Sequence, residues 1–278
     1  MLQVCLNGAR TRAEWPSLPV APGVLAAEAA RAVEAGAEDV HLHPKDAEGY
    51  DSLAPDAVAQ AVTAVRRAVP AGIRVGVTTG AWAVPDPERR VALVRSWTVL
   101  PDHASVNWHE EGAEEVARAL LDRGVGVEAG VWSGTGAARR FLASPLAGRV
   151  LRVLAEVTDT EPATAAGTAT ALLKELDPAV QRLPVLLHGE EGGAWPVLRL
   201  AGRLGLDART GLEDVLVLPD GSTARDNAAL VQAARTLLDG ARLDLADDGG
   251  DRGSSPDGPV RPGRPERKED PPFPPRRY

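Results

Sequence analysis

From the first residue to about position 246, short apolar runs alternate with longer stretches in which apolar residues recur every three or four positions. The short runs are typical of β-strands and the longer stretches of α-helices. The predicted strands are Leu2–Leu6, Asp39–His43, Ile73–Thr78, Ala104–Asn107, Val125–Trp132, Val150–Val157, Pro184–His188 and Leu206–Leu212. Eight strand-then-helix units in about 245 residues predict an α/β protein, a single closed (β/α)8 TIM barrel. The alternative is an open doubly wound sheet, but no glycine-rich dinucleotide fingerprint follows the first strand.

The ends of two helices carry recognisable signals. A first helix near Val24–Glu34 is followed by Gly36, a residue suited to the left-handed position after a helix. A last helix is expected near Thr223–Leu238, with Ser222 as its N-cap and Gly240 as its end.

The composition changes abruptly at the C-terminal end. Residues 247–278 are crowded with proline, glycine and charge and contain almost no aliphatic residues. Such a segment cannot bury enough apolar surface to offset the entropy lost on ordering. We therefore predict a catalytic domain over residues 1–246 and a disordered tail over residues 247–278.

Composition and charge narrow the function classes. Apolar residues at 44% and charged residues at 25% are ordinary for a soluble globular protein. The formal net charge of -8 argues against a nucleic-acid partner, which needs a clustered excess of lysine and arginine. A single cysteine, Cys5, cannot form an internal disulfide, and no apolar run is long enough to span a bilayer. We expect a cytoplasmic protein that binds neither membranes nor nucleic acids.

The candidate chemistry begins with two histidines at the end of the second predicted strand. A spacing of two places His41 and His43 on one side of that strand, at the barrel end where catalytic groups lie. Glu213 follows the eighth strand, and side chains from alternate strands share a layer of a barrel interior. Two histidines and one carboxylate with an open position form a catalytic zinc arrangement.

Three other interpretations stay open from the residues alone. The histidine pair could simply be two hydrogen-bonded polar residues at a strand end. A metal-dependent hydrolase of the amidohydrolase type also uses such a pair, but on the first strand and with further histidines on strands five and six. A barrel without catalysis, acting as a binding protein, would not need to hold metal.

Motifs along the chain resemble the β-keto acid cleavage enzymes, whose best-known activity is cleavage of 3-keto-5-aminohexanoate. The matching segments run in order from Val4 to about Leu238. They are Asn7-Gly8-Ala9, Val40-His41-Leu42-His43 with Asp46, Thr78-Thr79-Gly80, Ala104-Ser105-Val106-Asn107, Arg209-Thr210-Gly211-Leu212-Glu213-Asp214 and Asn227-Ala228-Ala229-Leu230-Val231. The resemblance implies a zinc (β/α)8 barrel that converts a β-keto acid and acetyl-CoA into acetoacetate and a new acyl-CoA.

The resemblance also implies roles for individual residues. One zinc ion per chain would be held by His41, His43 and Glu213, and zinc would polarise the keto oxygen. Asp214, oriented by Arg209, would be the base. The resemblance further implies a homo-oligomer, a tetramer by analogy. It places in the substrate pocket Thr79, Ser105, Asn107 and Glu128.

One position departs from the family pattern. Members that cleave amino-substituted substrates carry a glutamate after Gly8-Ala9, where this chain has Arg10. Because a cation does not attract a cation, we predict that Arg10 contacts a keto acid without a 5-amino group, either neutral or carrying a second anionic group.

Overall fold

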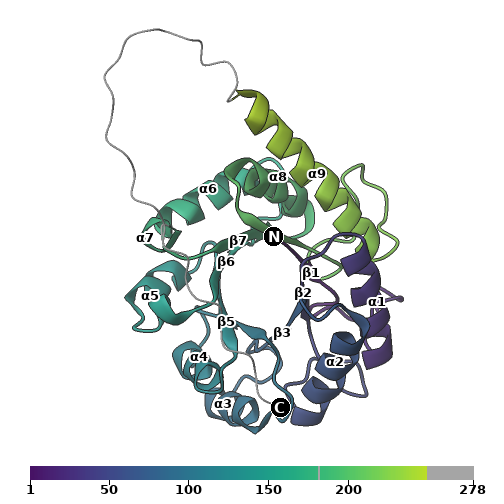
Figure 1. Ribbon diagram of the computed structural model, residues 1–278. Coiled ribbons are helices and arrows are strands. Elements are labelled where there is room, and N and C mark those ends of the chain that lie inside the picture. The colour runs from purple at the N-terminus through teal and green to yellow at the C-terminus, as the bar shows by residue number, and fades with distance from the viewer. Residues whose placement is uncertain (181, 249–278) are drawn as a thin grey trace.

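The computed structural model describes residues 1–180 and 182–248, and these form a closed barrel of eight parallel strands (Figure 1). Each strand pairs with the next along the chain, and β1 pairs with β8 to close the ring. The strands are β1 Leu2–Cys5, β2 Asp39–Leu42, β3 Arg74–Thr78, β4 His103–Asn107, β5 Gly126–Trp132, β6 Arg152–Val157, β7 Val185–Gly189 and β8 Asp207–Thr210. The predicted (β/α)8 barrel is confirmed, and all eight predicted strands are present.

Helices surround the barrel, and all but the last of those described lie between successive strands. The α-helices are α1 Pro22–Glu34, α2 Pro55–Ala68, α3 Pro87–Ser96, α4 Ala113–Leu121, α5 Ala137–Ala143, α6 Ala165–Glu175, α7 Asp177–Val180, α8 Ala194–Leu204 and α9 Asn227–Asp248. Three of them begin at a proline, whose fixed φ and missing N–H suit the first helical position. Within residues 1–180 and 182–248, no helix combines the length and apolar character needed to cross a membrane.

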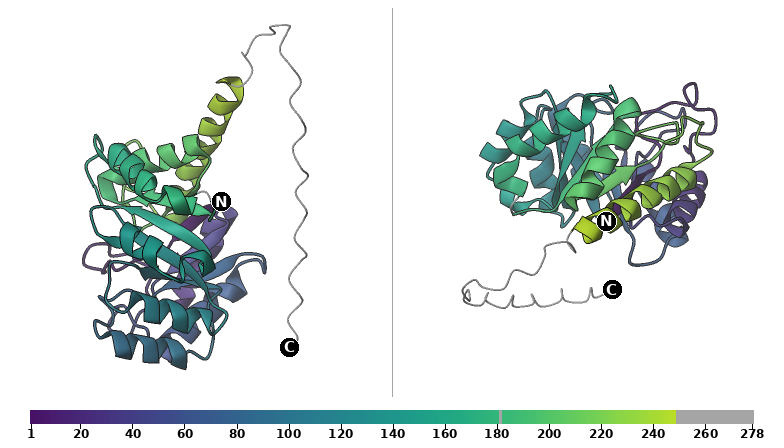
Figure 2. Two further views of the ribbon diagram at one scale, coloured as in Figure 1. Left: turned by 90° about the vertical axis from the view of Figure 1, so that its left-hand side faces the viewer. Right: turned by 90° about the horizontal axis from the view of Figure 1, so that it is seen from above.

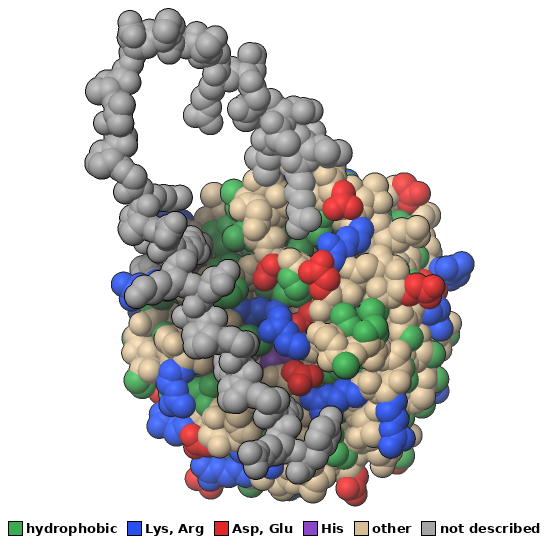
Figure 3. Space-filling view, viewed as in Figure 1, with side chains coloured by type: hydrophobic (Ala, Val, Ile, Leu, Met, Phe, Trp, Pro, Cys, Tyr) green, Lys and Arg blue, Asp and Glu red, His purple; other side chains and the backbone are tan. Residues whose placement is uncertain are grey.

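The hydrophobic core is the ring between strands and helices. It contains the outward-facing strand residues, among them Val4, Val40, Val127 and Ala155, which are fully buried. The barrel interior is polar instead, with Gln3, Asp39, His103, Glu128 and Arg152 at most 2% exposed. A barrel interior is usually filled by branched aliphatic side chains, so this one departs from the common pattern. Charged side chains of both signs gather around the centre of the face in Figure 3.

The last helix differs from its prediction at both ends. It begins at Asn227, because the Asp226 carboxylate accepts a hydrogen bond from the Ala229 backbone N–H (2.9 Å) and caps it. The predicted cap, Ser222, instead donates its hydroxyl to Asp220 (2.6 Å). The helix also continues through Gly240 to Asp248, and its last turns project beyond the barrel (Figure 2). It therefore includes the first two residues of the predicted tail, and the remainder, 249–278, lies outside the described residues.

Candidate active site

Three predicted ligands converge at the carboxyl ends of β2 and β8. His41 Nε2 lies 3.9 Å from one Glu213 oxygen, and His43 Nε2 lies 3.5 Å from the other. One candidate ligand atom from each residue lies within 4.8 Å of the other two. Glu213 reaches this position because Gly8 leaves room: a Cβ at Gly8 would lie 2.4 Å from Glu213 Cγ.

His43 lies at the rim, where Asp51 and Trp82 contact its ring. Its Nδ1 is 2.8 Å from Asp51 Oδ2, and Lys45 Nζ is 2.5 Å from the other Asp51 oxygen. The Trp82 ring stacks on the imidazole with centroids 5.8 Å apart and donates its N–H to Asp51 (2.6 Å). Burial opposes the imidazolium charge, but the Glu213 and Asp51 carboxylates outweigh it and raise the pKa of His43 to about 9.

His41 lies deeper and has fewer partners. Burial lowers the pKa of His41 to about 3, against the attraction of the Glu213 carboxylate. Its Nδ1 faces Glu128 Oε2 at 3.9 Å, too far for a hydrogen bond. The imidazole is therefore neutral, with one lone pair available for a ligand.

Arg209, on β8, joins the two acids that follow its strand. Its Nη2 lies 2.7 Å from Glu213 and 2.8 Å from Asp214, and its Nε lies 3.2 Å from Asp214 Oδ1. Burial raises the pKa of Asp214 even though Arg209 lowers it, while Arg209 and His43 outweigh burial and hold the pKa of Glu213 well below its usual range. Asp214 is thus the more basic of the two carboxylates, and the arginine fixes its orientation.

A cavity of about 310 Å³ opens over this cluster. Of the predicted site residues, Arg10, His43, Arg209, Glu213 and Asp214 line it. The Arg10 guanidinium donates to the backbone carbonyls of Leu212 (2.7 Å) and Glu213 (3.2 Å) and pairs with Glu191. The loop that carries Glu213 is therefore held by Arg10.

Four predicted pocket residues lie elsewhere around the cluster. Thr79 and Asn107 are used internally: the Thr79 hydroxyl donates to the Ser105 carbonyl (2.7 Å), and the Asn107 amide donates to Glu110 (2.9 Å). Ser105 is 8% exposed and does not line the cavity. Glu128 is fully buried beneath His41 and does not line it either.

Sequence reasoning missed several residues of the site. His188 and Glu156 line the cavity; the ring nitrogens of His188 lie 3.5 Å from Glu156 and 3.6 Å from Asp214. His188 ends the seventh predicted strand, and this position at the carboxyl end of a barrel strand could have indicated a site residue. Asp51 and Lys45, the partners around His43, lie in a loop without a recognisable pattern.

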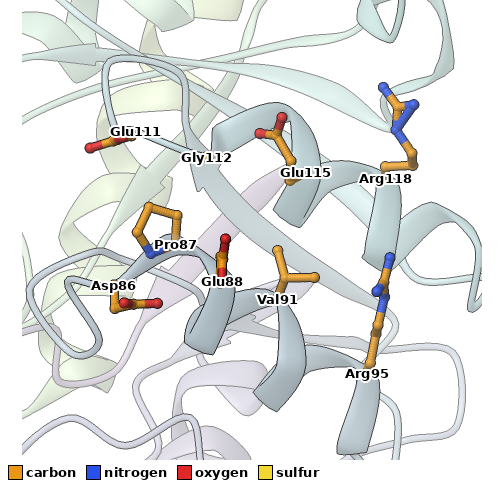
Figure 4. Close-up of a pocket in the computed structure, with 9 residues that line it drawn as sticks. All are labelled: Asp86, Pro87, Glu88, Val91, Arg95, Glu111, Gly112, Glu115 and Arg118. Carbon is orange, nitrogen blue, oxygen red and sulfur yellow. The ribbon is translucent and has the colours of Figure 1, made fainter.

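A larger hollow, of about 710 Å³, lies outside the barrel between α3 and α4 (Figure 4). Glu88 and Glu115 lie near the starts of these helices, and Arg95 and Arg118 lie in their last turns. This arrangement of charge complements the two helix dipoles, so the lining stabilises the helices themselves.

A family model described as beta-keto acid cleavage enzyme matches residues 1–249. Among solved structures, the ternary complex of ObcA with a C4-CoA adduct and oxalate is similar, with a TM-score of 0.60 and 20% sequence identity. That match covers 84% of this chain and 68% of that chain. D-glucarate dehydratase from Agrobacterium tumefaciens, complexed with magnesium, gives a TM-score of 0.48 at 15% identity, over 86% of this chain and 64% of that chain. At these identities the likeness to solved structures concerns the fold alone.

Proposed function

Because the chain belongs to the β-keto acid cleavage enzyme family, we propose that it condenses a β-keto acid with acetyl-CoA to give acetoacetate and a new acyl-CoA, with one zinc ion per chain. The observation that carries this proposal is the convergence of His41, His43 and Glu213 at the barrel mouth. The CoA adduct named for ObcA supports a CoA co-substrate. The homo-oligomeric state stays a prediction from the family.

The three residues fit a metal ion. The Nδ1 of His43 is engaged by Asp51, which leaves its Nε2 facing Glu213. Glu213 Oε2 is buried, and no described residue donates a hydrogen bond to it. An unpaired buried carboxylate oxygen beside two imidazole nitrogens suits a divalent cation, and two histidines with one carboxylate match catalytic zinc sites. When bound, zinc would supply a Lewis acid for the keto oxygen.

The chain's own acid and base groups would carry the proton steps. Asp214, held by Arg209, would take a proton from the carbon between the keto and carboxylate groups. The resulting carbanion attacks the acetyl thioester carbonyl, forming a carbon–carbon bond and releasing the CoA thiolate. The thiolate then attacks the original keto carbon and breaks its bond to the central carbon. The central carbon, now a carbanion, takes the proton back from Asp214, which gives acetoacetate and the new acyl-CoA.

Arg10 supports a substrate without a 5-amino group. Its guanidinium lines the cavity and would repel an ammonium group placed against it. Because Glu191 already pairs with Arg10, a second anionic group on the substrate would have to displace that carboxylate. We therefore propose a neutral side chain on the keto acid. Faster turnover of an amino-substituted keto acid than of its uncharged analogue would contradict this.

The test measures zinc per purified chain and acetoacetate released from a panel of β-keto acids with acetyl-CoA. Glu213→Gln removes the ligand charge and is expected to abolish both zinc retention and turnover. Glu48→Gln, an exposed carboxylate in the loop after β2, is the matched control and should retain both. Stoichiometric zinc and full turnover in Glu213→Gln would overturn the ligand assignment.

A further inference from the structure

A buried carboxylate lies beneath the proposed metal position. Glu128 is fully buried on β5, and its side chain points into the barrel interior. Its Oε1 accepts hydrogen bonds from Arg152 Nε (2.6 Å) and Gln3 Nε2 (2.9 Å). Two donors from two other strands therefore fix this carboxylate in one orientation.

The other Glu128 oxygen has no hydrogen bond from the described part of the chain, although two imidazoles face it. His103 Nδ1, which forms an ion pair with this oxygen, lies 3.2 Å away and His41 Nδ1 lies 3.9 Å away, and both nitrogens are also buried without a hydrogen bond. Three buried polar atoms without hydrogen bonds thus converge on one point. A carboxylate oxygen has two lone pairs, so Oε2 can accept from His103 Nδ1–H, whose Nε2 is already held by Asp39 (2.9 Å), and also from His41 Nδ1–H. A proton on His41 Nδ1 would leave the His41 Nε2 lone pair free.

From this geometry we infer that Glu128 is a positioning residue: its carboxylate favours the His41 tautomer with the proton on Nδ1 and so keeps Nε2 available for the metal. The inference rests on the proposed metal site. This positioning role takes the place of the substrate contact predicted for Glu128, because Glu128 is fully buried and does not line the cavity. Carboxylates commonly accept the outer N–H of a metal-bound histidine, which fixes ring orientation and raises ligand basicity.

The second histidine shows the same arrangement in a completed form. Asp51 Oδ2 lies 2.8 Å from His43 Nδ1. Each of the two histidines thus has its Nε2 toward Glu213 and its Nδ1 toward another carboxylate. That carboxylate is Asp51 for His43 at the rim and Glu128 for His41 in the interior. The difference is distance: about an ångström of ring movement would bring His41 within hydrogen-bonding range of Glu128.

The substitution Glu128→Gln gives a sharp test because its amide can adopt only one favourable orientation. Arg152 and Gln3 both donate, so the amide oxygen must stay at the Oε1 position. The amide NH₂ then faces His41 Nδ1 and favours the tautomer with the proton on Nε2. We expect zinc affinity, measured by chelator competition, to fall about 10- to 100-fold.

The tautomer itself is the second readout. Long-range ¹H–¹⁵N correlation spectra of ¹⁵N-histidine-labelled protein report which His41 nitrogen carries the proton. In metal-free wild type we expect the proton on Nδ1, and in Glu128→Gln on Nε2. Glu128→Asp keeps the charge but withdraws the carboxylate, so its zinc affinity should lie between those of the two proteins.

Val127→Ala controls for a general loss of stability. Val127 is fully buried on the same strand but faces the surrounding helices. It should lower the unfolding temperature without changing zinc affinity. Zinc affinity of Glu128→Gln within threefold of wild type would overturn the inference. So would an Nε2 proton in the metal-free wild-type protein, which decides the matter even if Glu128→Gln does not fold. Failure of wild type to bind zinc would instead contradict the proposed function.

Discussion

The two histidines of the candidate metal centre lie two residues apart, His41 on β2 and His43 directly after it, yet their surroundings differ. His43, at the rim, has its Nδ1 bonded to Asp51 and its ring against Trp82. His41, one layer deeper, lies above an ionic group of barrel-interior residues, Glu128, His103, Asp39 and Arg152. The comparison shows that strand spacing places donors on one face, whereas depth in the barrel decides what holds each donor. The neighbours of His43 at the rim belong to local loops, whereas the interior residues beneath His41 join several strands and contribute to the stability of the whole barrel.

The largest expected effect is a loss of unfolding free energy when an ion pair inside the barrel is removed. Arg152 is 2% exposed and contacts both Glu128 (2.6 Å) and Asp39 (2.9 Å). Arg152→Met removes the guanidinium shared by two buried carboxylates, which then keep His103 and, at Asp39, Arg74 as cationic neighbours. Breaking a buried ion pair in this way typically costs about 3–5 kcal/mol. Urea unfolding at neutral pH should show this loss. Lys45→Met at the rim is the comparison, and equal loss in the two variants would contradict the difference between the regions.

The interior should also make stability depend on pH. Burial disfavours the His103 imidazolium, but Glu128 and Asp39 outweigh it and raise the pKa of His103 to about 9, above the usual value of about 6.5. The stabilisation is therefore complete below pH of about 6.5 and is lost as the pH rises through about 9, by on the order of 3 kcal/mol.

Unfolding free energies of the zinc-loaded protein between pH 6 and 10 check this expectation. His103→Gln can still hydrogen-bond but carries no charge at any pH, so its stability should fall less steeply across the same range. Parallel curves for the variant and wild type would show that another group causes the dependence.

A smaller effect is expected at the rim. Asp51→Asn removes the negative charge beside His43 Nδ1 while keeping a similar shape. Zinc affinity should fall about 10- to 100-fold, as for other outer partners of histidine ligands. The unfolding free energy of the metal-free protein should change less than in Arg152→Met. Unchanged zinc affinity would mean that Asp51 does not orient the ring.

The smallest expected effect is that of Trp82→Phe. Phenylalanine keeps an aromatic ring on His43 but loses the N–H donated to Asp51. Because Trp82 is 44% exposed, water can replace that donor, and zinc affinity should change less than tenfold. A larger loss than in Asp51→Asn would show that the ring, and not the carboxylate, holds His43.

Sequence patterns predicted the barrel because alternating short apolar runs and amphipathic stretches record the strand–helix order directly. They also predicted that His41, His43 and Glu213 lie close together, because inward-facing side chains of alternate strands share one layer of the barrel. They did not predict the ionic interior. Asp39, Glu128 and Arg152 lie on three strands far apart in the chain, and a charged residue near a strand start normally indicates solvent exposure. The end of α9 was also misjudged, because a glycine weakens a helix without having to end it.

Gly76 on β3 adds a constraint that is invisible in any single strand. A Cβ at this position would lie 2.0 Å from the His103 ring, so the imidazole occupies the volume that a side chain at 76 would need. Positions 76 and 103 should therefore vary as a pair among relatives: a larger residue at 76 demands a smaller one at 103. Redesign of this barrel from within would have to treat the two as a single unit.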